Sequence, residues 1–508
     1  MRVLIFEPQF AGHNLAHAAR LVRAVTDLGC QPVLATSTQA AESTEFDVHL
    51  GPDRGLFELV ALPGFQTDPL GRRLRTSGLN SLAAGYRSLT RAVRDIRPDH
   101  VYLPCGNLLA RFGWLPLGLG AALRDCGAEA ETLLVSGRYL LPRRPLAARL
   151  RQRLVLRMIA AGPWTRVLYL NDATQAELTR HGGRITRTAR LAPDPFGQLP
   201  DITQSEARTA LGVPANGRAV AVVGLIEGRK GIAVLAQAMR DAADRLQPDD
   251  RLLLLGSFHP DVHTLLHEQY ADLLAAGRVV CVDRRLSSLE FGQAIRSADV
   301  VAAVCPHHAY TASTVVAGAA ARRPLLGSAN GWIGRTIRRF ELGRCCDAAN
   351  PASVADALVA TLDASATHTV TPAAERFVRY SSDANYAAHW TARLRERCGL
   401  APSPDLLTWE WALHGEEFAA AASGPRVEPP DEGVAAGEAD ATRPVRATPP
   451  VVIYRRVAGE AAPPRVDTAP AEAVVIDSAG AAAPPAAEHL AEPTELTEPT
   501  EPTSPRSG

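Results

Sequence analysis

Short runs of β-branched and aliphatic residues alternate with helix-spaced apolar residues over most of the first 380 residues. The run from Val220 to Val223 is typical, because it is long enough for a buried strand and too short for a helix. Gly224 ends this run, and from Ile232 onward apolar residues recur at helical spacing. Such alternation predicts parallel β-sheets with helices on both faces. The expected fold class is therefore α/β.

The alternating pattern forms two series, and a proline cluster from Pro193 to Pro200 separates them. The first series predicts strands at 2–6, 32–36, 58–62, 100–104, 131–135, 166–170 and 187–191. The second predicts strands at 220–223, 251–255, 279–282, 299–304 and 324–326. We expect two tandem Rossmann-like domains, 1–195 and 205–380, followed by a closing helix and packing segment at 381–417.

Residues 418–508 have a different composition, rich in alanine, proline and glutamate, with Glu-Pro-Thr repeated near the end. This composition cannot bury enough apolar surface to fold, so we expect a disordered C-terminal tail. Residues 401–508 carry 18 acidic and 7 basic side chains, whereas residues 1–400 carry 47 basic and 36 acidic ones. A basic body suits an anionic ligand such as a nucleotide, or an anionic membrane surface. No nucleic-acid-binding signature is present, and no nucleic-acid partner is expected.

The eight cysteines have no Cys-x-x-Cys spacing and lie mostly in apolar surroundings, which predicts reduced thiols. The N-terminus reads as a first strand and not as a signal peptide. No apolar run approaches the roughly 18 residues that a membrane span needs. We therefore expect a cytoplasmic protein.

Two loops are candidate binding sites because each joins a strand to a helix. After the strand at 220–223, backbone N–H groups and the helix dipole would attract an anion near Gly224, and Arg229 and Lys230 add cationic side chains. An ordinary connection with solvated basic residues is the alternative, since the turn matches no complete phosphate-loop pattern. Gly12 and His13 follow the first strand, and ligands of open sheets bind beyond such strand ends. A merely solvated His13 is the alternative there.

Several motifs occur in the order found in glycosyltransferase family four, the group-one retaining enzymes. They are the Gly12-His13 loop, the hinge Leu191-Ala-Pro-Asp-Pro195, the turn from Gly224 to Lys230-Gly231, the strand Leu252–Gly256 and the segment Ser297-Ala-Asp-Val-Val301. The chain resembles this family over most of residues 1–395. The resemblance implies the GT-B fold and transfer of a sugar from a nucleotide diphosphate donor, with Lys230 on the diphosphate. It also implies retention of configuration and no cofactor or metal. The acceptor, whether glycan, lipid-linked or small molecule, is left open.

The chain departs from the family pattern at several positions. Leu225 stands where an arginine is usual, Ala309 and Ala317 stand where the family has two glutamates, and Ser136 stands where a histidine commonly assists the reaction. Ser313 and Thr314 begin the helix after the strand at 299–304, where hydroxyls and free N–H groups can hold phosphate or ribose. Ser313 as a simple helix cap is the equal alternative.

These departures leave two hypotheses for the function. The first is a hexosyltransferase-like glycosyltransferase whose catalytic residues are not identified. The second is a degenerate GT-B protein that binds a nucleotide or a partner without catalysis. A dehydrogenase is disfavoured, because the loop at 9–13 lacks the glycines that a dinucleotide pyrophosphate needs.

Two further patterns have competing interpretations. His259, His263 and His267 recur every four residues, and we expect a solvated helix face there and no metal site. Residues 143–158 form a basic amphipathic helix with a leucine stripe. We expect its leucines to pack on the sheet, and a peripheral contact at the inner face of the membrane is the alternative.

Overall fold

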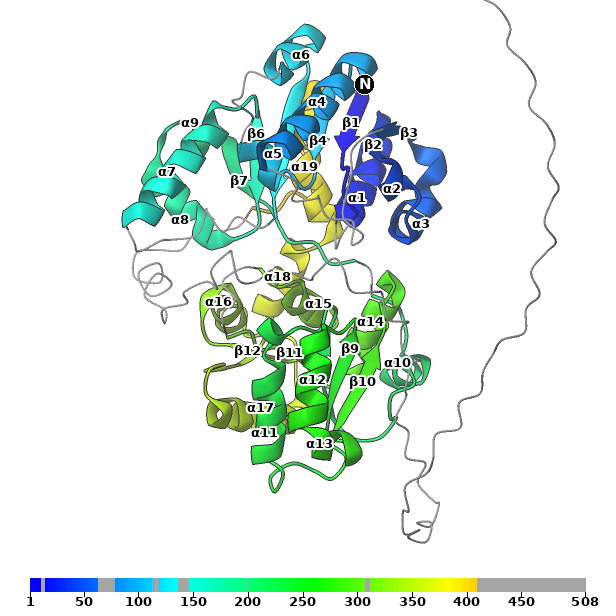
Figure 1. Ribbon diagram of the computed structural model, residues 1–508, viewed down its shortest axis with the longest axis vertical. Coiled ribbons are helices and arrows are strands. Elements are labelled where there is room, and N and C mark those ends of the chain that lie inside the picture. The colour runs from blue at the N-terminus through cyan, green and yellow to red at the C-terminus, as the bar shows by residue number, and fades with distance from the viewer. Residues whose placement is uncertain are drawn as a thin grey trace, which may run out of the picture. The chain divides into compact units, whose positions relative to one another are not determined.

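The computed structural model describes residues 1–10, 14–62, 78–111, 113, 118–135, 146–197, 199–306 and 311–408. Within these ranges the chain forms one seven-stranded and one six-stranded sheet, both parallel, with helices on their faces (Figure 1). The predicted α/β class with two Rossmann-like domains is confirmed. The predicted tail at 418–508 lies outside the described residues and stays a prediction.

The first sheet has the strand order β3-β2-β1-β4-β5-β6-β7. Its strands are β1 (Arg2–Phe6), β2 (Gln31–Ser37), β3 (Glu58–Leu62), β4 (His100–Leu103), β5 (Glu129–Leu134), β6 (Arg166–Tyr169) and β7 (Ala189–Leu191). The chain builds the sheet outward from β1 in one direction and then from β4 in the other. The strand order therefore reverses between β1 and β4, and open sheets bind ligands at the carboxyl ends of such strands.

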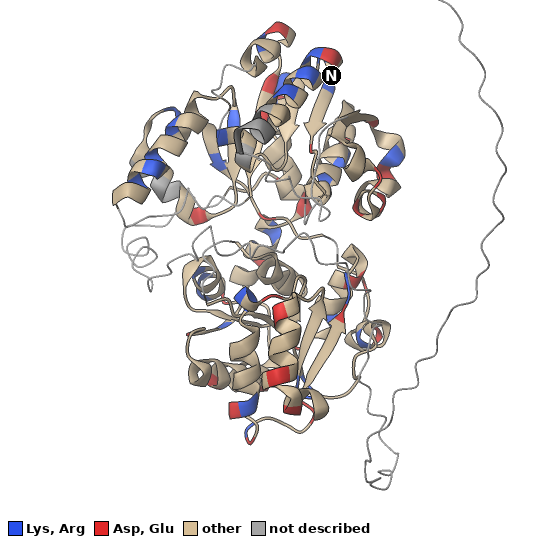
Figure 2. Ribbon diagram, viewed as in Figure 1, with Lys and Arg blue, Asp and Glu red and all other residues tan. Residues whose placement is uncertain are grey.

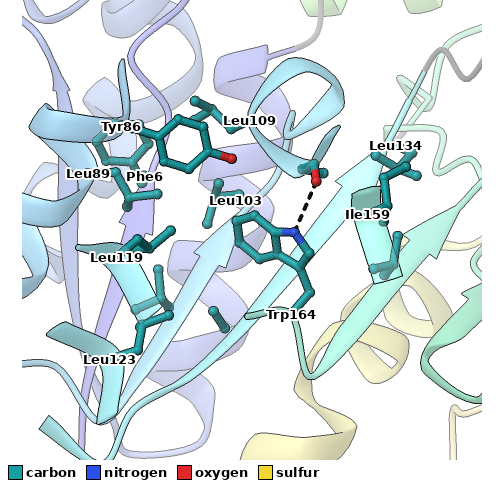
Figure 3. Close-up of a cluster of buried hydrophobic side chains, with 14 of the residues drawn as sticks. Phe6, Tyr86, Leu89, Leu103, Leu109, Leu119, Leu123, Leu134, Ile159 and Trp164 are labelled. Carbon is teal, nitrogen blue, oxygen red and sulfur yellow. Dashed lines mark hydrogen bonds between the residues drawn. The ribbon is translucent and has the colours of Figure 1, made fainter. Parts of the chain in front are cut away.

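Helices cover both faces of the first sheet. They are α1 (Asn14–Asp27), α2 (Thr38–Ala41), α3 (Thr44–Leu50), η1 (Gly51–Leu56), α4 (Gly78–Ile96), α5 (Asn107–Arg111), α6 (Leu119–Cys126), α7 (Leu146–Ala161), α8 (Asp172–His181) and α9 (Gly183–Thr188). Figure 3 shows the core of one face, where the Trp164 indole N–H donates to the Ala110 carbonyl at 3.2 Å. The other face buries Ile5 against Tyr386 and Trp390 of the last helix, α19 (Asp383–Arg397).

The second sheet has the order β10-β9-β8-β11-β12-β13. Its strands are β8 (Ala219–Val223), β9 (Arg251–Gly256), β10 (Val279–Asp283), β11 (Val300–Ala303), β12 (Leu325–Ser328) and β13 (Gly343–Cys346). Its helices are α10 (Gln204–Leu211), η3 (Gly228–Lys230), α11 (Ile232–Asp241), α12 (Pro260–Gln269), α13 (Ala271–Ala275), α14 (Ser288–Ser297), α15 (Ser313–Ala320), α16 (Gly331–Arg339), α17 (Pro351–Ser365) and α18 (Pro372–Tyr380). Here the strand order reverses between β8 and β11.

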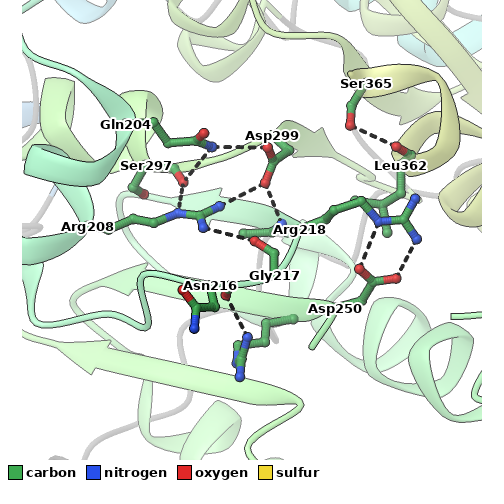
Figure 4. Close-up of polar contacts among 12 residues, drawn as sticks. Gln204, Arg208, Asn216, Gly217, Arg218, Asp250, Ser297, Asp299, Leu362 and Ser365 are labelled. Carbon is green, nitrogen blue, oxygen red and sulfur yellow. Dashed lines mark hydrogen bonds and ion pairs between the residues drawn. The ribbon is translucent and has the colours of Figure 1, made fainter. Parts of the chain in front are cut away.

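A polar network fixes the amino ends of the second sheet (Figure 4). The Asp299 carboxylate, just before β11, accepts from the Arg208 guanidinium at 2.8 Å and from the Ala219 N–H at 2.7 Å. Arg218 donates twice to Asp250, at 2.8 and 2.6 Å. Buried charges are tolerated when they are paired and hydrogen-bonded in this way. The network lies at the opposite ends of the strands from the candidate donor residues, so its role is structural.

The leucine stripe of α7 does not pack on the sheet, and that expectation is wrong. The helix instead buries Val155, Leu156 and Ile159. Leu146, Leu150 and Leu154 recur every four residues on the other side and are exposed. Helical spacing groups the leucines on one face, but it does not determine which face of the helix meets the sheet.

Candidate functional site

The connection from β8 to α11 depends on two glycines. Gly224 follows β8 with φ +97°, and its N–H donates to the Leu255 carbonyl at 2.9 Å. Gly231 has φ +68° and occupies the cap position of α11. A Cβ at Gly231 would lie only 2.2 Å from the Val304 carbonyl oxygen, just beyond β11. Glycine is therefore required at Gly231 both for its backbone conformation and for its close approach to the neighbouring strand end.

The turn between these glycines holds Lys230 against the end of its own strand. The partly buried Lys230 donates from Nζ to the Val223 carbonyl at 2.5 Å. Burial, together with the nearby charge of Arg229, lowers the pKa of Lys230 to about 8. Among the described residues, no carboxylate forms an ion pair with Nζ, so two of the three ammonium donors are left for a ligand.

Lys230 is also the only lysine in the 508-residue chain, which uses arginine for its other 53 Lys or Arg positions. Arginine presents a large planar fork of donors, whereas lysine is a compact charge that loses its proton when it is buried. Lys230 therefore differs in chemistry from every other cationic side chain of the sequence except the histidines.

The helix α15 begins after the strand next to β8. Val220 and Ala221 of β8 pair with Val300 and Val301 of β11, so the Lys230 turn and α15 follow the two strands that border the reversal point. The cap position of α15 is Ala312, which offers no side-chain acceptor. The interpretation of Ser313 as the helix cap is therefore wrong.

Ser313 and Thr314 occupy the first turn of α15 and are only partly buried. Unsatisfied N–H groups at a helix start attract anions, and hydroxyl groups add further donors. The start of α15 and the Lys230 turn thus both provide donors for a phosphate at the same edge of the sheet.

The linker between the two sheets contributes an acid that sequence patterns did not single out. Burial raises the pKa of Asp194 to about 6, and the charge of Arg20 and a hydrogen bond from Thr311 act against this rise. Thr311 lies two residues before α15. Asp194 therefore ties the linker to the segment that leads into this helix.

No protein-family model matches the chain, and no curated protein matches it by sequence. Solved structures do match. Sucrose-phosphate synthase from Thermosynechococcus elongatus aligns with a TM-score of 0.57 at 17% identity, over 78% of this chain and 99% of that one. A glycosyltransferase from Rickettsia africae gives 0.58 at 11%, over 79% and 99%. HepE from Anabaena, in complex with UDP, gives 0.56 at 16%, over 78% and 100%. The chain has the GT-B fold.

Within this GT-B fold, other residues of the turn are poor candidates for a phosphate ligand. Arg229 forms an ion pair with Glu227 inside the turn, so its charge is already balanced. Leu225, where the resemblance to family four implies an arginine, is exposed. Ala317 is 2% exposed and packs in the core of the second domain. Position 317 therefore provides no carboxylate for a ligand, because its alanine side chain is packed among core residues.

The candidate loop of the first domain lies partly outside the described residues, which exclude Gly12 and His13. The preceding residue Glu7 is described and is 1% exposed. It accepts from the Gln9 N–H at 3.1 Å and from the Asn14 amide at 3.3 Å. Burial raises the pKa of Glu7 to about 8. These two hydrogen bonds and a third with Cys105 favour the charged carboxylate and oppose the rise. A protonated carboxyl group at neutral pH therefore lies where the strand order reverses between β1 and β4.

The three histidines that recur every four residues, at 259, 263 and 267, all have side-chain contacts. His263 binds Asp283 at 2.6 Å and stacks on His267, while His259 caps α12. Among the described residues, no group of three or more histidine, cysteine or acidic side chains could hold a metal ion. Ala309 and Ser136 lie outside the described residues.

Proposed function

We propose that the protein is a glycosyltransferase that uses a nucleoside diphosphate sugar as its donor. The observation that carries the proposal is the position of the only lysine, which is partly buried at the reversal point of the second sheet with no carboxylate partner among the described residues. HepE, which has a similar fold, was solved with UDP and with UDP-glucose. A diphosphate is the anion that fits a site made of one ammonium group and a helix start.

The proposed reaction moves the sugar from the donor to a hydroxyl or other nucleophile of the acceptor. The bond between the anomeric carbon and the diphosphate oxygen breaks, a bond from the acceptor to the same carbon forms, and the acceptor proton passes to the departing diphosphate or to water. Negative charge then grows on the departing nucleoside diphosphate, and Lys230 and the N–H groups of α15 stabilise it. Ser313 and Thr314 bind phosphate or ribose, and the acceptor binds beside β1, near Gly12 and His13. Retention of configuration and the absence of a metal or cofactor follow from the family resemblance.

One observation favours the second candidate function, nucleotide binding without transfer. The family glutamate that contacts the donor corresponds to Ala317, which is buried in the core. The site therefore lacks a carboxylate for the donor sugar or ribose at this position. Measurements that separate binding from turnover distinguish the two candidates.

The test uses the unique lysine. An amine-acylating reagent can modify only Lys230 and the N-terminal amine, so peptide mass spectrometry measures modification of Lys230 directly. UDP-, GDP- and ADP-sugars are screened for protection of Lys230 and for release of nucleoside diphosphate. We expect one donor class to protect Lys230 and to be turned over. Lys230→Met should abolish release, whereas Arg229→Met, which removes the paired neighbouring charge, should retain most of it.

Each other outcome has a defined meaning. Protection of Lys230 without release of nucleoside diphosphate would support nucleotide binding without catalysis. Turnover without protection, or full activity of Lys230→Met, would contradict the placement of the diphosphate at this turn.

A further inference from the structure

The helix α7 presents an apolar stripe to solvent. Leu146, Leu150 and Leu154 are 72%, 56% and 58% exposed. They lie one helical turn apart, so their side chains form one continuous stripe. The opposite face of α7 is already packed in the domain core. Exposing three neighbouring leucines to water is unfavourable, and such patches mark interaction sites.

Arginines surround this stripe. Four arginines of α7 are exposed, and the helix has no acidic residue. They are Arg149, Arg151, Arg153 and Arg157. Each residue of an α-helix is rotated by about 100° from the one before it. Arg153 and Arg157 therefore lie on the same side of α7 as the leucines, and Arg149 and Arg151 lie on either side of the leucine stripe. Figure 2 shows this concentration of basic residues along α7.

The neighbouring helix α9 packs against α7 and extends the basic region. Its residues Arg184 and Arg187 are exposed, and it also has no acidic residue. Arg153 and Arg157 act on His181 at the end of α8, where burial and these two charges lower the pKa of the imidazole. The positive charge is therefore a property of the folded surface and not of one helix alone.

We propose that this α7 face, the stripe Leu146, Leu150 and Leu154 with its surrounding arginines, docks on the surface of an anionic lipid bilayer. The leucines enter the boundary between head groups and acyl chains, and the guanidinium groups bind lipid phosphates. A bilayer is the occupant that satisfies both features at once, because it offers negative charge at its surface and an apolar layer directly beneath. A nucleic acid would bind the arginines and leave the leucine stripe in water.

Docking of the α7 face on a bilayer is independent of sugar transfer. Its connection to the proposed function is the acceptor, because α7 belongs to the same domain as the proposed acceptor site. Docking by this face would give the protein access to an acceptor anchored in the membrane. No described helix is long and apolar enough to cross a membrane.

The experiment is co-sedimentation of the full chain with vesicles, without any sugar donor. We expect binding to vesicles of equal parts phosphatidylglycerol and phosphatidylcholine, and little binding to phosphatidylcholine alone. The double variant Leu150→Ser, Leu154→Ser should bind the anionic vesicles more than about tenfold more weakly. Leu289→Ser is the matched control, because Leu289 is a leucine with the same 58% exposure as Leu154 but lies on α14.

A second pair of substitutions tests the charge. Arg153→Gln with Arg157→Gln should weaken binding to anionic vesicles and reduce its sensitivity to salt. Circular dichroism verifies the fold of each variant. Equal binding by the leucine double variant and the Leu289→Ser control would overturn the proposal. A wild-type chain that does not bind anionic vesicles would also overturn it. So would a chain that binds polyglutamate as strongly as vesicles, if the leucine substitutions weakened neither interaction.

Discussion

Lys230 differs from the arginines of the chain because its proton can dissociate near neutral pH. Burial lowers its pKa from 10.5 to about 8, whereas a guanidinium stays charged at every pH that the fold tolerates. A bound diphosphate would favour the charged form and raise this pKa again. Proton binding by Lys230 and nucleotide binding are therefore coupled.

This coupling predicts a pH profile. Below about pH 8 the ammonium is charged and attracts the diphosphate, and above it the charge is lost. The affinity for UDP, or for the donor nucleotide that the screen identifies, should fall by up to about tenfold per pH unit above the pKa. Calorimetric titrations from about pH 7 to about pH 9 measure this profile.

Two substitutions control for other titrating groups. Lys230→Arg should flatten the profile, because its charge persists, and Lys230→Met should bind weakly at every pH. A profile that keeps its wild-type shape in both variants would show that another group titrates.

Other residues of the site illustrate what the sequence could not reveal. Lys230 and Gly224 are predictable because a strand, a turn and a helix are local in the chain. Glu7 looks like any polar residue that ends a strand. Its side chain hydrogen-bonds to Cys105, which follows β4 almost a hundred residues later. Asp194 hydrogen-bonds in the same way to Thr311. Burial raises both pKa values, and these bonds to distant segments oppose the rise, so local patterns give no signal for either group.

Among the elements, the β8 turn offers a direct test of backbone geometry. Gly231→Ala would place a methyl group 2.2 Å from the Val304 oxygen and strain a φ of +68°. We expect a loss of about 1 to 3 kcal/mol in the free energy of unfolding, and weaker nucleotide binding because the turn that carries Lys230 must shift. Chemical denaturation and nucleotide titration measure the two effects.

The same turn provides the matched control. Gly228 has no atom within 4 Å of an added Cβ and has no positive φ. Gly228→Ala should therefore leave stability and binding close to wild type. If both variants behaved alike, the close approach between the turn and β11 would not matter for the site.

The sequence predicts helices and strands correctly where the composition of a segment determines how it packs. It fails where the packing depends on which other elements lie beside the segment. The strands at 58–62 and 251–255 match β3 and β9 closely, because runs of aliphatic residues leave few alternatives. The edge strand β13 was missed because Gly343-Arg-Cys-Cys346 contains no apolar run and is half exposed. The leucine stripe of α7 was found, but its exposure depends on which helix face meets the sheet.

At the scale of the whole molecule, the last helix connects the end of the described chain to its beginning. Tyr386 donates to or accepts from the His17 ring at 2.8 Å, and the Tyr102 hydroxyl donates to the Trp390 carbonyl at 3.1 Å. This packing brings Cys398, at the end of α19, next to Cys30, which precedes β2. The two sulfur atoms lie 3.8 Å apart, and both cysteines are free thiols. Cysteine spacing in the sequence could not predict this pair, because 368 residues separate its members.

The pair predicts a specific oxidation product. Hydrogen peroxide should accept two electrons and two protons from the thiols of Cys30 and Cys398, which yields one disulfide and two molecules of water. Burial and the neighbouring Cys398 raise the pKa of Cys30, so oxidation should accelerate as the pH rises and more thiolate forms. Non-reducing peptide mapping should find the cross-linked peptides. The bond should raise the thermal midpoint, because it constrains the unfolded chain. Cys30→Ser should abolish the cross-link and Cys126→Ser should not. Over-oxidation of Cys398 without any cross-link would show that the two sulfur atoms do not meet in solution.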